Sequence, residues 1–398
     1  MNRFYSTPAK LRSQAESHAA RRSPPSIELA IVGAGMMGQE HLRVTELLGR
    51  ANVRGVLEPN EGSFAAASSL YGGAKLRRYD SLEEVIADPK LDAVIVSTPN
   101  FTHASLFEAL IRSNKALLIE KPMATTLKDA ARMVEYAQER AEPVQLGMQY
   151  RYKSQYVELF HRIKTQSAVG PIKTLSVSEY RPPFLDKVEQ WNKFNANTGG
   201  TLVEKCCHYF DLMNLMAERR PSRVYASGGQ AVNFLDFERN GERSDIDDHA
   251  FVIVDYEDSI RASFTLNMFC AELFEEMVVT GPKGRLVAKE TASFQDRPSR
   301  ATVLDDTDAH RGIEEHEVTY APAIERSGHH GATYFEHVAF LDAVEGKPVD
   351  AATPLQGLWA MILASAAQRS IREARPVDIQ EHIQEEMGQS TLVKEGRL

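Results

Sequence analysis

Short apolar runs alternate with amphipathic segments from residue 27 to about residue 146. The runs are rich in β-branched residues and predict buried strands, and the segments between them have helical spacing. Two of the helices begin with capping-box sequences, at 81–84 and 126–129, in which side chains satisfy the first backbone amides. Such alternation is typical of βαβ units around a parallel sheet. The expected strands are 28–32, 53–57, 93–97, 116–119 and 144–146.

The pattern changes after Arg151, where apolar and polar residues alternate as they do in half-exposed strands. Turn sequences at 256–259 and 281–284 separate these strands. This pattern indicates one open, mostly antiparallel sheet. The expected strands are 172–180, 223–227, 250–256, 259–267 and 276–280, and the expected helices are 198–216, 334–344 and 354–373.

Charge and cysteine content narrow the kinds of partner. Lys and Arg number 46 against 55 Asp and Glu, a net charge of -9, so no broad surface for nucleic acid is expected. No run approaches the roughly eighteen apolar residues that span a bilayer. The three cysteines outline no disulfide framework, and the adjacent Cys206 and Cys207 are expected to pack in the interior. We therefore expect a cytoplasmic protein with a small-molecule partner, without a nucleic acid, membrane or metal partner.

A glycine-rich motif, Gly-Ala-Gly-Met-Met-Gly at 33–38, follows the first expected strand and opens a helix. The glycines permit a tight turn and close approach of a pyrophosphate, and the helix N-terminus offers free amides. Glu58 ends the second strand, where a carboxylate accepts hydrogen bonds from ribose hydroxyls and repels a 2′-phosphate. The motif therefore predicts NAD, preferred over NADP. The cofactor-binding residues expected here are Gly33, Gly35, Met36, Met37, Gly38 and Glu58.

These patterns predict an α/β fold class, with an N-terminal Rossmann doubly wound parallel sheet and a C-terminal α+β domain whose open sheet is mostly antiparallel. We expect the NAD-binding domain over 27–148 and a substrate and oligomerisation domain over 149–378, with its last helices packing back on the first domain. A flexible basic tail is expected over 1–26 and a C-terminal tail over 379–398.

Two further strand ends carry polar residues. Ser-Thr-Pro-Asn at 97–100 ends one strand and is followed by Thr102-His103, and Glu-Lys-Pro at 120–122 ends another. Ligands of doubly wound sheets bind beyond the carboxyl ends of the strands, so these turns are expected at the cofactor. The residues concerned are Ser97, Thr98, Asn100, His103, Glu120 and Lys121.

Together these motifs resemble the glucose-fructose oxidoreductase and inositol dehydrogenase (Gfo/Idh/MocA) family of NAD(P)-dependent oxidoreductases. The resemblance continues at 199–211, Gly-Gly-Thr-Leu-Val-Glu-Lys-Cys-Cys-His-Tyr-Phe-Asp, and at 170–172 and 328–331. It covers about residues 27–378 and implies a Rossmann domain, an open-faced sheet domain and an active site between them.

The resemblance implies that Lys121, Glu204 and His208 are the catalytic residues. On one helix Glu204 and His208 would share a face, and a carboxylate beside an imidazole raises its basicity. We expect His208 to take the proton of a substrate hydroxyl and Lys121 to stabilise the developing alkoxide. The family usually has Asp at the position of Glu204 and a small residue at that of Cys206, so the pocket wall differs here. The alternative is that the acidic and imidazole groups form a solvated face or a core pair.

A further set of residues is expected at the substrate. His329 and His330 lie in a glycine-flanked stretch that, by family position, approaches the substrate, and Arg151 lies at the domain junction. Lys205 is a candidate partner for an anionic substituent. The full set is Arg151, Tyr180, Lys205, Asp211, His329 and His330.

By the resemblance, the leading function is an NAD-dependent dehydrogenase acting on a CH-OH group of a sugar, sugar derivative or inositol-like polyol. An NAD-dependent glycosidase that uses transient oxidation, elimination and re-reduction is an alternative, and a non-catalytic NAD-binding sensor is a second. Lys121 and His208 argue against the sensor, because a binding module needs no proton acceptor. An exposed face of the second sheet would need cover, so a homodimer or homotetramer through that sheet is expected.

Overall fold

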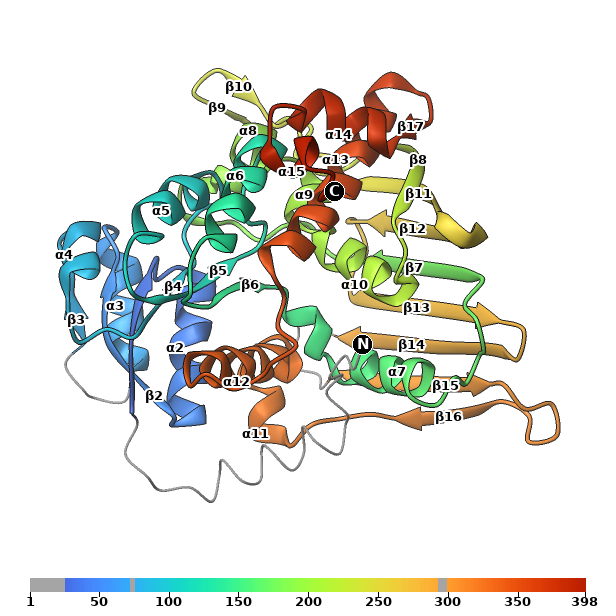
Figure 1. Cartoon of the computed structure of the whole chain (residues 1–398), viewed down its shortest axis with the longest axis horizontal. Coiled ribbons are helices and arrows are strands. Elements are labelled where there is room, and N and C mark those ends of the chain that lie inside the picture. The colour runs from blue at the N-terminus through green and yellow to red at the C-terminus, as the bar shows by residue number, and fades with distance from the viewer. Residues whose placement is uncertain (1–25, 72–75, 293–298) are drawn as a thin grey trace. The chain divides into compact units, whose positions relative to one another are not determined.

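The computed structural model describes residues 26–71, 76–292 and 299–398 (Figure 1). Nearly all of the expected N-terminal tail therefore lies outside the described residues. The chain forms two compact units, one of Met1–Tyr152 with Tyr320–Leu358 and the other of Lys153–Thr319 with Trp359–Leu398.

The first unit is built on a six-stranded sheet in the order β3-β2-β1-β4-β5-β6, in which every neighbouring pair is parallel. The order reverses beside β1, which is the point where doubly wound sheets bind their ligands. The predicted Rossmann sheet is confirmed. Its strands are β1 (Ile27–Val32), β2 (Ala51–Leu57), β3 (Arg77–Arg78), β4 (Ala93–Val96), β5 (Ala116–Glu120) and β6 (Val144–Gly147).

Helices of the first unit begin where capping was expected. Ser81 accepts a hydrogen bond from the Glu84 amide at 3.3 Å, and Thr126 accepts one from Asp129 at 3.1 Å. A late segment also belongs to this unit, because α12 contacts α2 (Figure 1). The helices are α2 (Met36–Leu48), α3 (Glu61–Leu70), α4 (Leu82–Ala87), η1 (Asn100–Thr102), α5 (His103–Leu110), α6 (Leu127–Gln138), η2 (Gln149–Tyr152), α11 (Pro322–Glu325), η5 (His329–Gly331) and α12 (Ala332–Val344).

The second unit contains a nine-stranded sheet in the order β16-β15-β14-β13-β7-β12-β11-β8-β17. Only the β12 and β7 pair is parallel, so the predicted mostly antiparallel sheet is confirmed. Sequence analysis missed β14 to β16, because their many charged residues mask the alternation. The strands are β7 (Thr174–Tyr180), β8 (Pro221–Gly229), β11 (His249–Tyr256), β12 (Arg261–Asn267), β13 (Leu273–Gly281), β14 (Gly284–Ala292), β15 (Arg300–Asp306), β16 (Glu314–Glu317) and β17 (Val377–Asp378), beside the short hairpin β9 (Glu238–Arg239) and β10 (Glu242–Arg243).

Helices contact one face of this sheet, and the other face is more exposed. In Figure 1, α7 lies along β14 and β15, which it contacts, and α10 contacts β7. Burial alternates along β11 and β12, so every second side chain points away from the core. The helices are α7 (Ser154–Lys164), η3 (Val188–Lys193), α8 (Asn195–Thr198), α9 (Thr201–Glu204), α10 (Cys207–Ala217), η4 (Glu257–Ser259), α13 (Pro354–Glu373, whose residues 354–358 belong to the first unit), α14 (Ile379–Met387) and α15 (Thr391–Lys394).

The single helix expected over 198–216 is wrong, because the chain forms α8, α9 and α10 there. Gly199 and Gly200 adopt φ values of 81° and 94°, which end α8. The left-handed φ of Gly200 would strain any other residue, and an added Cβ would also displace the end of the Gln368 side chain. A second interruption at 205–206 places Glu204 and His208 in different helices.

The expected C-terminal tail over 379–398 is also wrong. The segment forms α14 and α15, and the Asp378 carboxylate caps α14 by accepting the Glu381 amide at 2.9 Å. Ile379, Ile383 and Met387 recur at helical spacing and are buried. Sequence analysis missed this amphipathic face because charged residues dominate the segment.

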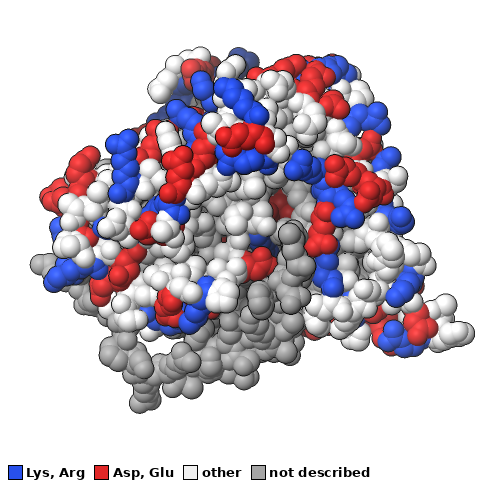
Figure 2. Space-filling view, viewed as in Figure 1, with Lys and Arg blue, Asp and Glu red and all other residues white. Residues whose placement is uncertain are grey.

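Lys and Arg are interspersed with Asp and Glu over the face shown in Figure 2. Among the described helices, none is both long and apolar enough to cross a membrane.

Candidate functional site

The glycine turn between β1 and α2 is closely packed around one open position. A Cβ on Gly33 would lie 2.8 Å from the Ser97 carbonyl group, and a Cβ on Gly38 would lie 2.1 Å from the Gly33 oxygen. A Cβ on Gly35 would meet no atom within 4 Å. Gly35 is the N-cap of α2 and offers no side-chain cap to its amides. The turn therefore leaves space and backbone donors at a helix N-terminus, which suits a pyrophosphate.

Glu58 follows β2 and is held beside this turn. Its Oε2 accepts the Ala34 amide at 2.7 Å and its Oε1 accepts the Asn60 amide at 2.8 Å. Each carboxylate oxygen has a second lone pair, so Glu58 can still accept a ribose hydroxyl.

A cation that sequence analysis missed lies against the same turn. Arg78 of β3 donates to the backbone oxygens of Glu58 and Pro59, each at 3.0 Å, and pairs with Glu61 at 2.6 Å. It escaped notice because it comes twenty residues after Glu58, on the neighbouring strand.

The turn after β4 joins the glycine turn. Ser97 donates to the Gly33 oxygen at 2.7 Å, and the hydroxyls of Thr98 and Thr102 are 2.6 Å apart. Asn100 is buried, and its Nδ2 has no hydrogen-bond partner within the described part of the chain. An unused buried donor beside the glycine turn again fits a polar ligand.

Two of the expected cofactor residues face the interior. His103 is fully buried, and its ring nitrogens lie 2.8 Å from the Pro122 oxygen and 2.9 Å from the Thr98 oxygen. Burial lowers the pKa of His103. Glu120 is buried, and its Oε2 accepts the Lys121 amide at 3.1 Å. These two side chains hold the turns in place, and Lys121 lies half-buried at the end of β5.

Three of the expected substrate residues belong to the first unit. His329 Nδ1 lies 2.7 Å from Glu40 Oε1. Burial acts to raise the pKa of Glu40, but the charge and hydrogen bond of His329 and a bond from Thr333 outweigh it and lower the pKa to about 2. His330 has a left-handed φ of 54°. Arg151 donates to Gln356 at 3.1 Å.

The other candidates belong to the second unit. Glu204, His208 and Asp211 are all buried, and Glu204 Oε1 accepts a hydrogen bond from Lys187 at 3.1 Å. Lys205 pairs with the buried Glu179 at 3.0 Å. Tyr180, at the end of β7, is partly exposed.

The adjacent cysteines are both buried. Burial raises the pKa of Cys206 well above the usual thiol value. This environment is that of a packing residue.

One group of buried ionisable residues was not expected: His41, Glu120, Glu336 and His337 in the first unit. Glu120 was singled out as an individual residue, and ionisable side chains inside otherwise apolar helical patterns are the signal that could have found the other three.

Two family profiles match the chain. Residues 27–148 match the oxidoreductase family with an NAD-binding Rossmann fold, and residues 165–379 match the C-terminal alpha/beta domain of that family.

Individual relatives are similar to this chain in the same two domains or in part of them. A myo-inositol 2-dehydrogenase from Thermotoga maritima is 24% identical over 361 residues, which span 90% of this chain and 100% of the relative. An inositol 2-dehydrogenase from Saccharopolyspora erythraea is 32% identical over 147 residues, 36% of this chain and 42% of the relative. The crystal structure of myo-inositol dehydrogenase from Lactobacillus casei, in complex with NAD(H) and myo-inositol, aligns with a TM-score of 0.68 at 19% identity, over 88% of this chain and 96% of that one.

The two profile matches follow the two sheets described above and together cover most of the chain. The chain therefore belongs to the Gfo/Idh/MocA oxidoreductase family, with an NAD-binding Rossmann fold and a C-terminal alpha/beta domain.

Proposed function

We propose that the protein is an NAD-dependent dehydrogenase that oxidises a secondary hydroxyl of a sugar, sugar derivative or inositol-like polyol. The observation that carries the proposal is the glycine turn with Glu58 fixed against it by the Ala34 amide. The substrate class rests on the likeness to the Thermotoga maritima relative over its full length.

The first unit is proposed to hold the cofactor. The open position at Gly35 and the uncapped amides of α2 would receive the pyrophosphate, and Glu58 would accept the ribose hydroxyls. Preference for NAD over NADP rests on Glu58, because Arg78 is already engaged by two carbonyls and Glu61. When bound, NAD supplies the hydride acceptor.

The chain's own residues are proposed to handle the proton. His208 takes it from the substrate hydroxyl, and the Lys121 ammonium stabilises the negative charge that develops on that oxygen. Glu204 is held by Lys187 and is proposed to orient the imidazole. The proposed substrate contacts remain Arg151, Tyr180, Lys205, Asp211, His329 and His330.

The test is a panel of inositols, free sugars and aryl glycosides, incubated with protein and NAD while NADH and aglycone are followed in the same wells. NADH formed from a free polyol or sugar supports the proposal. Aglycone release at constant NADH would replace it with the redox-cycling glycosidase. Tight NAD binding with silence in both channels would favour the sensor.

We also propose a homodimer or homotetramer that covers the exposed face of the second sheet. Phe251, Ile253 and Tyr225 on β8 and β11 are 61%, 54% and 43% exposed, which is unusual for neighbouring apolar side chains. Light scattering that gives a monomer mass would contradict this proposal.

The limits expected for the two domains, 27–148 and 149–378, stay predictions. The expected cytoplasmic location also stays a prediction.

A further inference from the structure

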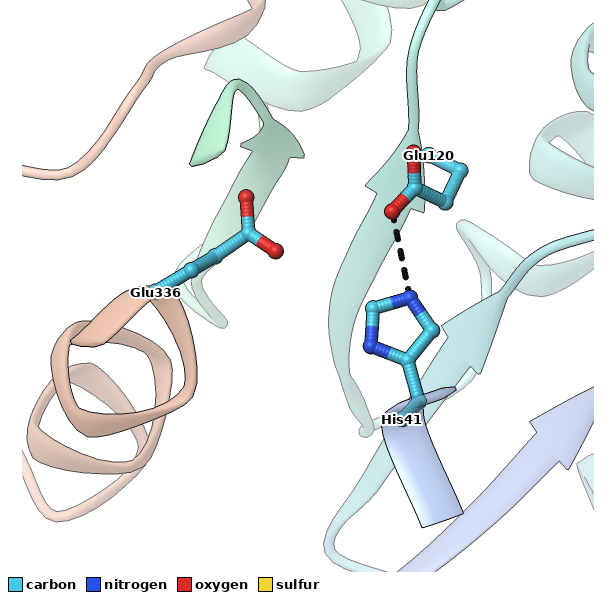
Figure 3. Close-up of side chains that lie close together, drawn as sticks. All are labelled: His41, Glu120 and Glu336. Carbon is cyan, nitrogen blue, oxygen red and sulfur yellow. Dashed lines mark hydrogen bonds and ion pairs between the residues drawn. The ribbon is translucent and has the colours of Figure 1, made fainter. Parts of the chain in front are cut away.

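Three buried side chains meet in the first unit between α2, β5 and α12 (Figure 3). His41 and Glu336 are fully buried, and Glu120 is 3% exposed. Each offers one ligand atom, and these atoms lie within 4.8 Å of one another. Sequence analysis found no such group, because its members come from three distant segments.

The hydrogen bonds around His41 fix which of its nitrogens faces the group. The Thr45 hydroxyl donates to the His41 backbone oxygen at 2.7 Å, so it can only accept from His337 Nδ1, at 3.4 Å. With Nδ1 as its donor, a neutral His337 ring carries its lone pair on Nε2. Its Nε2 then accepts from His41 Nδ1 at 2.8 Å.

His41 Nε2 therefore faces Glu120 Oε1, at 3.1 Å. A neutral His41 ring directs a lone pair at this carboxylate oxygen, and two acceptors repel each other. The pair requires either a shared proton or a bound cation between the two atoms.

Glu336 adds a second negative group that the described chain does not satisfy. Figure 3 shows its carboxylate extending from α12 toward Glu120 and His41, and neither of its oxygens has a hydrogen-bond partner among the described residues. An unpartnered carboxylate in the interior is strongly unfavourable unless a proton or a cation joins it.

We propose that His41 Nε2, Glu120 and Glu336 bind a divalent transition-metal ion, with Zn²⁺ as the best match. One imidazole and two carboxylates suit zinc better than they suit magnesium or calcium, which prefer oxygen ligands alone. The 3.1 Å between His41 Nε2 and Glu120 Oε1 is close to the roughly 3.4 Å edge of a tetrahedral zinc site. This proposal replaces the sequence-based expectation of no metal.

The surroundings have two features of a built metal site. His41 donates its other ring N–H to His337, which is the bond that usually orients a metal-binding histidine. A Cβ on Gly147 would lie 3.1 Å from Glu120 Oε2, so the glycine leaves room for this carboxylate. Because Glu120 Oε2 also accepts the Lys121 amide, the ion would join α12 to the turn that carries Lys121.

The experiment measures metal content, because a buried site is expected to load during folding. The full-length protein is expressed without a histidine tag in medium supplemented with zinc sulfate, dialysed against a chelator, and analysed by mass spectrometry for zinc per chain. We expect about one zinc per wild-type chain and a loss of at least tenfold in Glu336→Gln. Glu275→Gln, which alters an equally buried carboxylate of the second unit, is expected to retain the zinc.

A second measurement uses only wild-type protein and therefore tests the proposal even when Glu336→Gln does not fold. Wild-type protein grown with Co²⁺ instead of zinc is expected to show visible absorption bands of a four-coordinate cobalt site. Wild-type zinc content no higher than that of Glu336→Gln, or absence of the cobalt bands, would overturn the proposal and leave Glu336 as a carboxylic acid that holds a proton.

Discussion

Each unit of the protein buries two carboxylates close together, but the two clusters are balanced in different ways. In the second unit, Lys153 Nζ lies 2.7 Å from Glu275 and 2.8 Å from Glu290. Gln155 donates to both carboxylates at 2.9 Å, and the Tyr209 hydroxyl donates to Glu275 at 2.8 Å. In the first unit, Glu336 has no hydrogen-bond partner among the described residues.

The difference distinguishes a cluster that stabilises the fold from a cluster that is a candidate binding site. Where the chain supplies its own cation and donors, as Lys153 does, the buried charges fix the packing of α7 against β13 and β14. Where a buried carboxylate is left to an outside partner, the group is a candidate for binding. We therefore expect substitutions in the first kind of region to change stability and substitutions in the second kind to change binding or activity.

The largest effect is expected at His208. Removal of a general base costs on the order of 10² to 10⁴ in turnover, so His208→Ala should lower kcat by that factor while the Kd for NAD stays within about twofold. Steady-state kinetics and a fluorescence titration with NAD measure the two quantities. His161→Ala, which alters a histidine of α7, is the matched control and should match the wild type. Normal turnover in His208→Ala would refute its proposed role.

The charge-balanced cluster is tested by Lys153→Met. Two buried carboxylates would lose their cation, and breaking such a pair costs about 3–5 kcal/mol in the free energy of unfolding. Urea unfolding monitored by circular dichroism gives this value. The triple variant with Glu275→Gln and Glu290→Gln should recover part of the loss, since no charge then remains to be balanced. A Lys153→Met variant as stable as the wild type would contradict the expected structural role of this cluster.

Glu58→Ala tests the binding side of the comparison. Loss of hydrogen bonds to a ribose should weaken NAD binding by about 1–3 kcal/mol, and NADP should bind relatively better because Arg78 remains beside the turn. Adding Arg78→Ala should cancel the gain for NADP. Titration with both cofactors measures the effect, and an unchanged ratio of the two Kd values would contradict the assignment of Glu58.

His382 provides a pH-dependent test in the second unit. Burial, and then the charges of Arg369 and Arg372, lower its pKa to about 4. The unfolded chain, with a pKa near 6.5, binds the proton first. Stability from this group is therefore complete above pH 6.5 and lost as the pH falls toward 4. Urea unfolding at several pH values should show that His382→Gln loses less free energy of unfolding than the wild type as the pH falls. The same dependence on pH in both proteins would argue against a buried neutral His382 ring.

The smallest effect on stability is expected for Glu336→Gln in metal-free protein. The amide replaces a carboxyl group that has no hydrogen-bond partner among the described residues, so the free energy of unfolding should stay within about 1 kcal/mol of the wild type or rise. Thermal unfolding of chelator-treated proteins measures it. A loss of stability as large as that of Lys153→Met would mean that both clusters serve to stabilise the fold.

Sequence analysis predicted the features that rest on local spacing. The glycine motif, Glu58 and the turns at Ser97 and Lys121 follow buried strands, and the turns packed around the glycine motif are held by Ser97. It failed where distant segments meet: Arg78 reaches the Glu58 turn from the next strand, and Glu336 reaches Glu120 from α12. It also failed at Gly199 and Gly200, whose left-handed backbone ends a helix that the apolar pattern alone would continue.

The first unit is discontinuous, and this affects how the chain is made. Its parallel sheet is complete at β6, but α12, which contacts α2, begins only at Ala332. A ribosome therefore releases every strand of the second unit's sheet except β17 before it releases the helix that contacts α2. The nascent first unit must wait with the polar side chains of α2 that pair with α12, among them Glu40 and His41, still without these partners, so this unit is expected to complete its folding late in synthesis.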